Sequence, residues 1–242
     1  MRRLNWTHQW LLSHFPIDEH RVALQGHSMG SAGSTVWAKT NPELFSTVTI
    51  FNNGFEGPDC SLADVDPGEI TSLDITSFGL RTDALPTVLR NPSGQSVPWT
   101  DLYDLTHPIS SQRDLPLWRV FHAKNDDNGV MHWDANVVSQ FEAADASGHG
   151  YQLWWDEGIH SPGEVPSYFH GGVAAATQTG RDDVVYQWRY RNDQSYPAFY
   201  DHRLYPNSHD PGDGTQGTTA DPVYSGDDWG AWGGFHDWEP DS

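Results

Sequence analysis

Cysteine and lysine are both scarce in this sequence. Cys60 is the single cysteine among 242 residues, which excludes an intrachain disulfide and a thiolate metal cluster but does not decide the cellular compartment. Lys39 and Lys124 are the two lysines, and with 11 arginines they oppose 33 acidic residues, giving a formal net charge of −20. Phosphate backbones and anionic membrane surfaces attract basic proteins, so we expect no nucleic-acid or membrane partner.

Long apolar runs are missing as well. No run of about 18 apolar residues, the length that spans a bilayer, occurs in the chain. Arg2 and Arg3 lie near the N-terminus, but polar residues from Asn5 onward interrupt any apolar signal-peptide region. Neither a glycine-rich phosphate loop nor the spacing of paired histidine ligands is present. We therefore expect a soluble protein without a metal or nucleotide cofactor.

The clearest functional signal is a G-x-S-x-G motif at residues 26–30. Residues 21–25 predict a buried parallel strand and residues 31–40 predict a helix, so the motif lies at a strand-to-helix turn. Such a turn presents the serine hydroxyl, its glycines allow close backbone approach, and the first N–H of the helix faces the developing oxyanion. Ser28 is therefore the candidate nucleophile and the Met29 N–H the candidate oxyanion donor, although so short a motif also matches by chance.

Strands and helices alternate along much of the chain. The predicted strands that follow the motif are residues 47–51, 117–122 and 151–155, and the predicted helices are residues 3–15 and 133–146. The first helix has an apolar face that we expect to pack on the core, formed by Leu4, Leu11 and Phe15 with Trp6 and Trp10 beside them. The alternation predicts an α/β fold with a parallel sheet and right-handed crossovers.

Composition divides the chain into a core and an extension. We expect an α/β core over residues 1–192 and, within it, a lid-like insertion over residues 55–114; a surface embellishment without substrate contact is the alternative. Residues 193–242 are acidic and glycine-rich but also aromatic, which predicts an irregular extension that docks. The aspartates of residues 210–214 fit no twelve-residue Ca²⁺ loop, so a solvated tail is favoured over a metal site.

A serine nucleophile needs a histidine base and a carboxylate that orients the base. Among 13 histidines, we choose His160, because it lies just after the strand at residues 151–155, at the sheet edge where Ser28 also emerges. The acid is expected in the loop after the preceding strand, which offers Asp126 and Asp127. We prefer Asp126, but the sequence does not separate the two.

The chain order serine, aspartate, histidine is that of α/β-hydrolases. Asp18 and residues 21–30, 123–126 and 158–160 resemble the motifs of that superfamily and, more narrowly, of bacterial esterases of the polyhydroxyalkanoate-depolymerase-like and prolyl-oligopeptidase-like branches. The resemblance covers roughly residues 1–175. It implies a three-layer α/β-hydrolase fold and serine esterase chemistry.

One departure from that superfamily is large. Its members carry strands before the elbow strand, and a loop there supplies a second oxyanion donor, whose loss can cost roughly 100- to 1000-fold in rate. This chain begins at the helix before residues 21–25, so we expect an N-terminally truncated sheet with a bare apolar edge that needs a cover. The candidates are residues 195–200, the aromatic segment at residues 229–238, and a second copy of the chain, which would make a homo-oligomer.

The leading hypothesis is a serine esterase that cleaves a small ester substrate through an acyl-enzyme. His27 and Trp133 are candidate substrate-pocket residues, and Trp154 and Trp155 are further pocket walls that core packing explains equally well. A catalytically weak fragment or binding protein that keeps the three catalytic side chains is one alternative. A serine peptidase of the same fold is the other.

Overall fold

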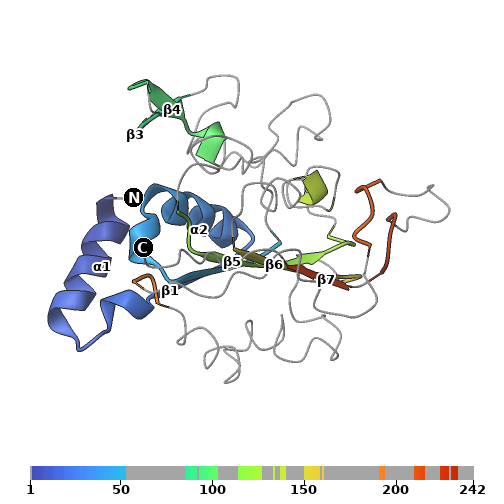
Figure 1. Ribbon diagram of the computed structural model, residues 1–242, viewed down its shortest axis with the longest axis horizontal. Helices are drawn as coiled ribbons and strands as arrows, with labels where there is room; N and C mark the ends of the chain where they lie inside the picture. The colour runs from blue at the N-terminus through green and yellow to red at the C-terminus, as the bar shows by residue number, and fades with distance from the viewer. Residues whose placement is uncertain are drawn as a thin grey trace, which may run out of the picture.

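The structure is a computed structural model of the chain. It describes residues 2–52, 85–91, 93–102, 114–126, 133, 137–139, 150–158, 160, 191–193, 210–215, 224–228 and 230–233. These residues form a five-stranded sheet, a separate two-stranded sheet and the helices packed around them (Figure 1). The candidate nucleophile, base and acid all follow strands of the larger sheet.

The larger sheet has the strand order β1-β2-β5-β6-β7. Its strands are β1 (Ala23–His27), β2 (Thr47–Phe51), β5 (Leu117–Ala123), β6 (Tyr151–Asp156) and β7 (Gly230–Gly233). The first four pair in parallel, and β7 pairs antiparallel with β6. The mostly parallel α/β arrangement predicted from the sequence is confirmed, and β7 is a strand that the sequence pattern did not predict.

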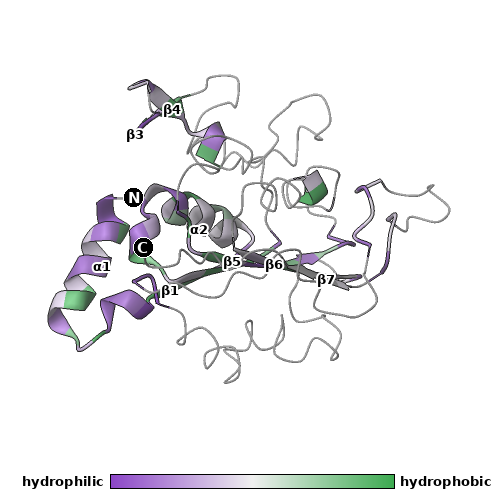
Figure 2. Cartoon of the chain, viewed as in Figure 1, coloured by the Kyte–Doolittle hydropathy of each residue, from purple (hydrophilic) through white to green (hydrophobic). Residues whose placement is uncertain are grey.

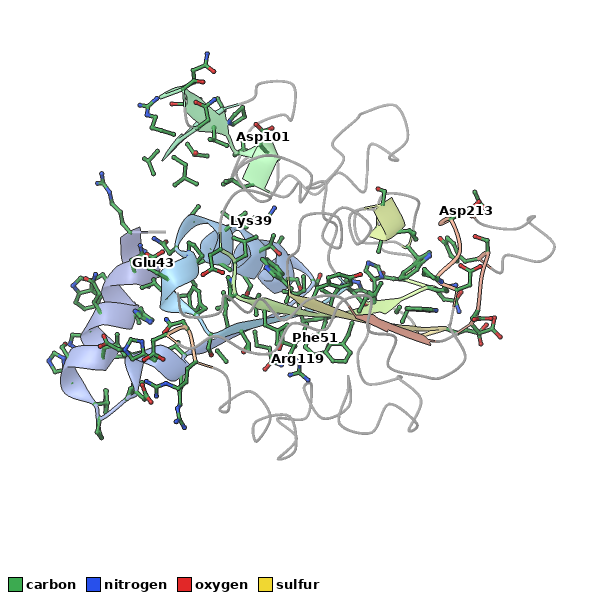
Figure 3. All side chains as sticks on the ribbon, viewed as in Figure 1. Lys39, Glu43, Phe51, Asp101, Arg119 and Asp213 are labelled. Carbon is green, nitrogen blue, oxygen red and sulfur yellow. The ribbon has the colours of Figure 1, made fainter. Side chains whose placement is uncertain are left out.

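The two central strands are buried along their whole length. Every residue of β2 and β5 is buried, because each strand has a parallel neighbour on both sides and both of its faces are covered. One face packs against α2 (Met29–Thr40). Phe51 and Arg119 lie on the opposite face (Figure 3), where the Phe51 ring stacks on Phe121 at 5.0 Å. This part of the molecule therefore has layered α/β packing.

A hydrophobic core lies between α2 and the sheet. Its central strand residues include Val48, Ile50 and Val120, all of them 0% exposed. Of the helix predicted over residues 133–146, the structure describes Trp133, which joins this core, and residues 137–139, which are helical. Within the described part of the chain, no helix combines the length and the apolar character that crossing a membrane requires.

The edge strand β1 is only partly buried. Ala23 and Gln25 are exposed, whereas Leu24 is half-buried. The prediction of a buried strand is wrong in this respect, because β2 is the only strand paired with β1 among the described residues. An apolar run indicates a strand but does not tell how many neighbours that strand has.

Helix α1 (Arg2–His14) forms where the sequence predicts a helix, but its expected core face is wrong. The apolar side chains Leu4, Trp6, Trp10 and Leu11, and Phe15 after the helix, are exposed. His8 is buried instead, and its ring meets Trp37 and Phe45 edge-on. Burial lowers the pKa of His8. Hydrophobic and hydrophilic residues alternate along α1 in Figure 2, so its pattern specifies a helix without specifying the packed face.

The described part of the insertion is a small hairpin with a helical turn. Strands β3 (Pro86–Arg90) and β4 (Ser96–Pro98) pair antiparallel, and the turn η4 (Thr100–Leu102) follows. Val97 and Leu102 pack against Val36 of α2, which places the hairpin on the side of α2 away from the sheet (Figure 1). The lid-like role predicted for residues 55–114 stays a prediction, since most of that segment lies outside the described residues.

The C-terminal extension docks at the β6 edge. Lys124 Nζ donates hydrogen bonds to the Ser225 carbonyl at 2.9 Å and to the Asp227 carbonyl at 2.7 Å. Trp155 Nε1 also donates to the Asp227 carbonyl, at 3.0 Å. Together with β7, these bonds join the described parts of the extension to the main sheet.

The position of β7 overturns one expectation about the extension. The sequence offers residues 229–238 as a cover for the β1 edge, but their described part, β7, pairs with β6 at the opposite edge. The irregular tail expected over residues 193–242 likewise contributes a strand to the sheet. Residues 195–200, the other proposed cover, lie outside the described residues.

Candidate active site

Ser28 lies in a strained turn between β1 and α2. Its backbone has φ 54° and ψ −124°, in the left-handed region that non-glycine residues rarely adopt. A Cβ at position 26 would collide with the Gly30 carbonyl and approach Ser34 Oγ to 2.6 Å, so glycine is required there. A Cβ at Gly30 would meet open space, so the close approach of the two backbones requires glycine at position 26 but not at position 30. The turn therefore has the strand-to-helix form that the motif predicts.

Ser31 fixes the turn from inside the fold, and sequence reasoning missed it. Its buried hydroxyl shares its proton between the Gly26 carbonyl at 2.8 Å and the Phe51 carbonyl at 2.6 Å, and it accepts a hydrogen bond from the Phe51 N–H at 3.0 Å. The Ser28 N–H donates to the same Phe51 carbonyl at 3.0 Å. These bonds tie the strained turn to the end of β2. A serine three residues after the nucleophile carries no sequence signal that separates it from an ordinary helix residue.

The structure brings Ser28, His160 and Asp126 together in one line of hydrogen bonds. His160 Nε2 lies 2.8 Å from Ser28 Oγ, and His160 Nδ1 lies 2.7 Å from Asp126 Oδ2. The carboxylate can only accept, so it fixes the imidazole tautomer with its proton on Nδ1, and the Ser28 hydroxyl donates to Nε2. This arrangement lets the imidazole take a proton from the serine hydroxyl.

Burial differs along this line of residues. The Asp126 side chain is 0% exposed and the His160 side chain is 25% exposed. A buried carboxylate against a partly open imidazole stabilises the imidazolium that forms when the histidine takes a proton. Asp127, the alternative acid, lies outside the described residues, and its role stays open.

The loop that carries His160 is held by the loop that carries Asp126. Asn125 N–H donates to the Gly158 carbonyl at 3.1 Å, and Asn125 Nδ2 donates to the Glu157 carbonyl at 2.7 Å. Asn125 is thus a second residue that the sequence analysis missed. An asparagine beside a predicted catalytic aspartate gives a weak signal, because asparagine is common in any turn.

The structure describes both predicted pocket residues, and His27 as a pocket residue stays a prediction. His27 Nε2 lies 2.9 Å from the His160 carbonyl oxygen, so this ring contacts the loop of the candidate base. Trp133 is 0% exposed in the hydrophobic core, with the Trp155 ring at 6.1 Å and Lys124 Nζ at 5.4 Å from its centroid. Trp133 as a pocket wall is therefore wrong, because a fully buried core side chain has no surface for a substrate.

The role of the Met29 N–H as an oxyanion donor stays a prediction. Met29 is the first residue of α2. The first N–H groups of a helix have no acceptor within the helix and carry its positive partial charge, so they suit a developing oxyanion. Within the described part of the chain, no group of three metal-ligating side chains lies close enough together to hold an ion.

The comparisons with known proteins find neighbours of low similarity. No protein-family model and no curated protein matches the sequence. An S-formylglutathione hydrolase from Staphylococcus aureus is 13% identical, with a TM-score of 0.46 over 76% of this chain and 59% of that one. Fluorophosphonate-binding serine hydrolase F from the same organism is 16% identical, with a TM-score of 0.48 over 77% and 62%. An S-formylglutathione hydrolase from Agrobacterium tumefaciens is 19% identical, with a TM-score of 0.47 over 76% and 55%.

This chain spans less than two thirds of the length of each of those proteins. Their identities and TM-scores are too low to transfer an activity or a subfamily to it. The narrower resemblance to polyhydroxyalkanoate-depolymerase-like and prolyl-oligopeptidase-like esterases stays a prediction.

Proposed function

We propose that this protein is a serine hydrolase that cleaves carboxylic esters through an acyl-enzyme intermediate. The observation that carries the proposal is the line of hydrogen bonds from Ser28 Oγ through the His160 ring to Asp126 Oδ2, at 2.8 and 2.7 Å. These are the distances over which a general base takes a proton from a hydroxyl. The strained backbone of Ser28 supports the same role, because strain of this kind gathers at functional sites.

The reaction follows from these three side chains. As Ser28 Oγ bonds to the ester carbonyl carbon, its proton passes to His160 Nε2 and the carbonyl oxygen becomes an oxyanion beside the Met29 N–H. The C–O bond to the alcohol then breaks, and the imidazolium returns its proton to the leaving alkoxide. Water attacks the acyl-enzyme with His160 again as the base, and Ser28 is released. Asp126 keeps the imidazole in the required tautomer throughout.

A catalytically weak fragment or binding protein is the second candidate. It is favoured by the position of β1 at the sheet edge, since no strand paired beyond β1 is found among the described residues. The second oxyanion donor that α/β-hydrolases take from that region would then be lost, and such a loss costs roughly 100- to 1000-fold. A peptidase of the same fold uses the same line of hydrogen bonds and differs in its turnover of aminoacyl amides.

Titration with a fluorophosphonate tests the proposal. An activated serine is labelled once per chain, and mass spectrometry of the peptide identifies the position. We expect complete labelling at Ser28 in the natural chain and none in Ser28→Ala. A folded natural chain that stays unlabelled at Ser28 would overturn the hydrolase proposal and leave the binding protein.

A further inference from the structure

Two side chains form hydrogen bonds with the backbone carbonyl of the candidate base. His27 Nε2 lies 2.9 Å from the His160 carbonyl oxygen, and Asn52 Nδ2 donates to the same oxygen at 3.2 Å. A carbonyl oxygen only accepts, so the His27 ring carries its proton on Nε2. We call this pair of side chains on the His160 carbonyl the carbonyl clamp.

The clamp residues stand at the ends of two neighbouring strands. His27 is the last residue of β1, next to Ser28, and Asn52 follows β2 directly. Asn52 is 5% exposed and adopts φ 47°, a left-handed conformation that asparagine tolerates better than most residues. Its N–H donates to the Phe121 carbonyl, and its Oδ1 accepts from the Ala123 N–H, both at 2.9 Å. Asn52 thus connects β2, β5 and the His160 loop.

The order of the strands explains why the His160 ring needs such a support. His160 follows β6, whereas Ser28 follows β1, and the strand order places β2 and β5 between them. The His160 ring must therefore be held across two strands to reach Ser28 Oγ. The His27 and His160 rings also lie 5.1 Å apart, centroid to centroid. A misplacement of about 1 Å at such a site costs roughly 100-fold in rate.

We propose that His27 and Asn52 are positioning residues that hold the His160 ring in line between Ser28 and Asp126. This inference rests on the proposed hydrolase function. The clamp touches the backbone of the base, which acts in proton transfer, so its loss lowers kcat more than it changes KM. If these bonds only satisfied a buried carbonyl, their loss would lower stability and leave kcat unchanged.

Three substitutions separate the donor from the bulk of the side chain. His27→Phe keeps a ring but removes the donor, and His27→Gln removes the ring but keeps an N–H donor. Asn52→Asp keeps the acceptor for the Ala123 N–H and replaces the donor on the His160 carbonyl with an oxygen. His20→Ala is the matched control, because His20 precedes the same strand and bonds through its ring to Asn192, at 2.8 Å, away from the site.

The kinetic readout uses a p-nitrophenyl ester. We expect His27→Phe and Asn52→Asp to lose about 10- to 100-fold in kcat, with KM nearly unchanged. His27→Gln recovers most of the kcat, and His20→Ala matches the natural chain. The melting temperature of the His27 variants shifts by no more than about 4 °C, since one hydrogen bond contributes about 1 kcal/mol. Asn52→Asp buries a carboxylate against a carbonyl oxygen and lowers the melting temperature further. Unchanged kcat in both His27→Phe and Asn52→Asp would overturn the clamp.

A readout that needs no turnover keeps the two proposals distinguishable. The His160 Nδ1 proton, hydrogen-bonded to a buried carboxylate, gives a downfield NMR signal that can be assigned by its loss in Asp126→Asn. We expect this signal to weaken or shift in His27→Phe and to persist in His27→Gln and His20→Ala. A signal that is identical in all three variants would overturn the clamp even if the esterase is active. A signal that responds as expected, in a chain that fluorophosphonate does not label, would overturn only the hydrolase proposal.

Discussion

The four parallel strands of the main sheet are flanked differently on their two sides. At the β6 edge, β7 adds an antiparallel strand, and Lys124 and Trp155 donate hydrogen bonds to the adjoining backbone. At the β1 edge, the described residues contain no further strand, and Ala23 and Gln25 are exposed. We refer to these as the closed edge and the open edge.

The comparison teaches that the members of the candidate site come from both sides of the sheet. Ser28 follows the open edge, and His160 follows the strand at the closed edge. The loops between them are tied together at the carboxyl ends of the strands by Asn52 and Asn125 as well as by His27. Cross-links between loops can hold the three side chains in place even where the described residues add no strand beyond β1.

The largest effect is expected from removing the candidate nucleophile or the candidate base. Ser28→Ala at the open edge and His160→Ala at the closed edge should each lower kcat for a short-chain p-nitrophenyl ester by about 10⁶-fold, to the rate that binding and the oxyanion donor alone support. Both variants should retain the far-UV circular dichroism of the natural chain. More than about a tenth of the activity left in either variant would contradict their assignment.

A smaller effect is expected from the acid, which lies in the loop after the central strand β5. Asp126→Asn should lower kcat by about 10⁴-fold, because an amide favours the wrong imidazole tautomer. Asp127→Asn is the control, with a far smaller loss. Steady-state kinetics of the two variants, measured side by side, decide which aspartate orients His160. A larger loss of kcat in Asp127→Asn than in Asp126→Asn would assign that role to Asp127.

Lys124 tests what holds the closed edge. Lys124→Met keeps an unbranched apolar side chain but removes the ammonium over the Trp133 ring and the donor to the Ser225 and Asp227 carbonyls. We therefore expect a loss of about 2 kcal/mol in the free energy of unfolding. Urea unfolding of the variant and of the natural chain measures this difference in free energy. Arg90→Met, at the exposed end of β3, should change the free energy of unfolding by less than about 0.5 kcal/mol. Equal stability of the two variants would show that β7 alone closes the edge.

The same lysine gives the closed edge a pH dependence. Burial lowers the pKa of Lys124, against the attraction of the Asp228 and Asp227 carboxylates. Below the ordinary value of 10.5, the unfolded chain therefore binds more protons at this position than the folded chain. The free energy of unfolding should rise with pH across the window from the lowered pKa up to 10.5, and Lys124→Met should lack this rise. If the free energy of unfolding of Lys124→Met rose with pH as steeply as that of the natural chain, the assignment of this pH dependence to Lys124 would be contradicted.

Local patterns predicted the site better than they predicted its surroundings. The turn at Ser28 follows from a short motif between a strand and a helix, and both need only neighbouring residues. The placement of Asp126 and His160 follows from topology, since parallel strands end at one edge of the sheet. The sequence analysis missed Asn52 and Ser31, because their importance comes from contacts with segments that are distant in the sequence. No local pattern records such contacts.

The errors of the sequence analysis have the same origin. The apolar residues of α1 predict a helix, but which face packs depends on a partner such as Trp37 in another helix. Trp133 gives no sequence signal that separates a pocket wall from a core residue, because a large aromatic ring suits both places. No sequence pattern predicted the pairing of β7 with β6, since an antiparallel strand can join a sheet at either of its edges.

The smallest perturbation addresses the open edge itself. Among the described residues, no strand pairs with β1 on its outer side. Two β1 strands can pair across a two-fold axis there, so we predict a homodimer. Ala23→Lys places a charge on the exposed residue at the start of β1 and should give a monomer with unchanged activity. Val88→Lys, on a side chain that is 92% exposed in the hairpin, adds the same charge elsewhere and should leave the dimer intact. Size-exclusion chromatography with light scattering compares each species with the chain mass of 27.1 kDa. A monomeric natural chain would show that the open edge is not closed by a second copy.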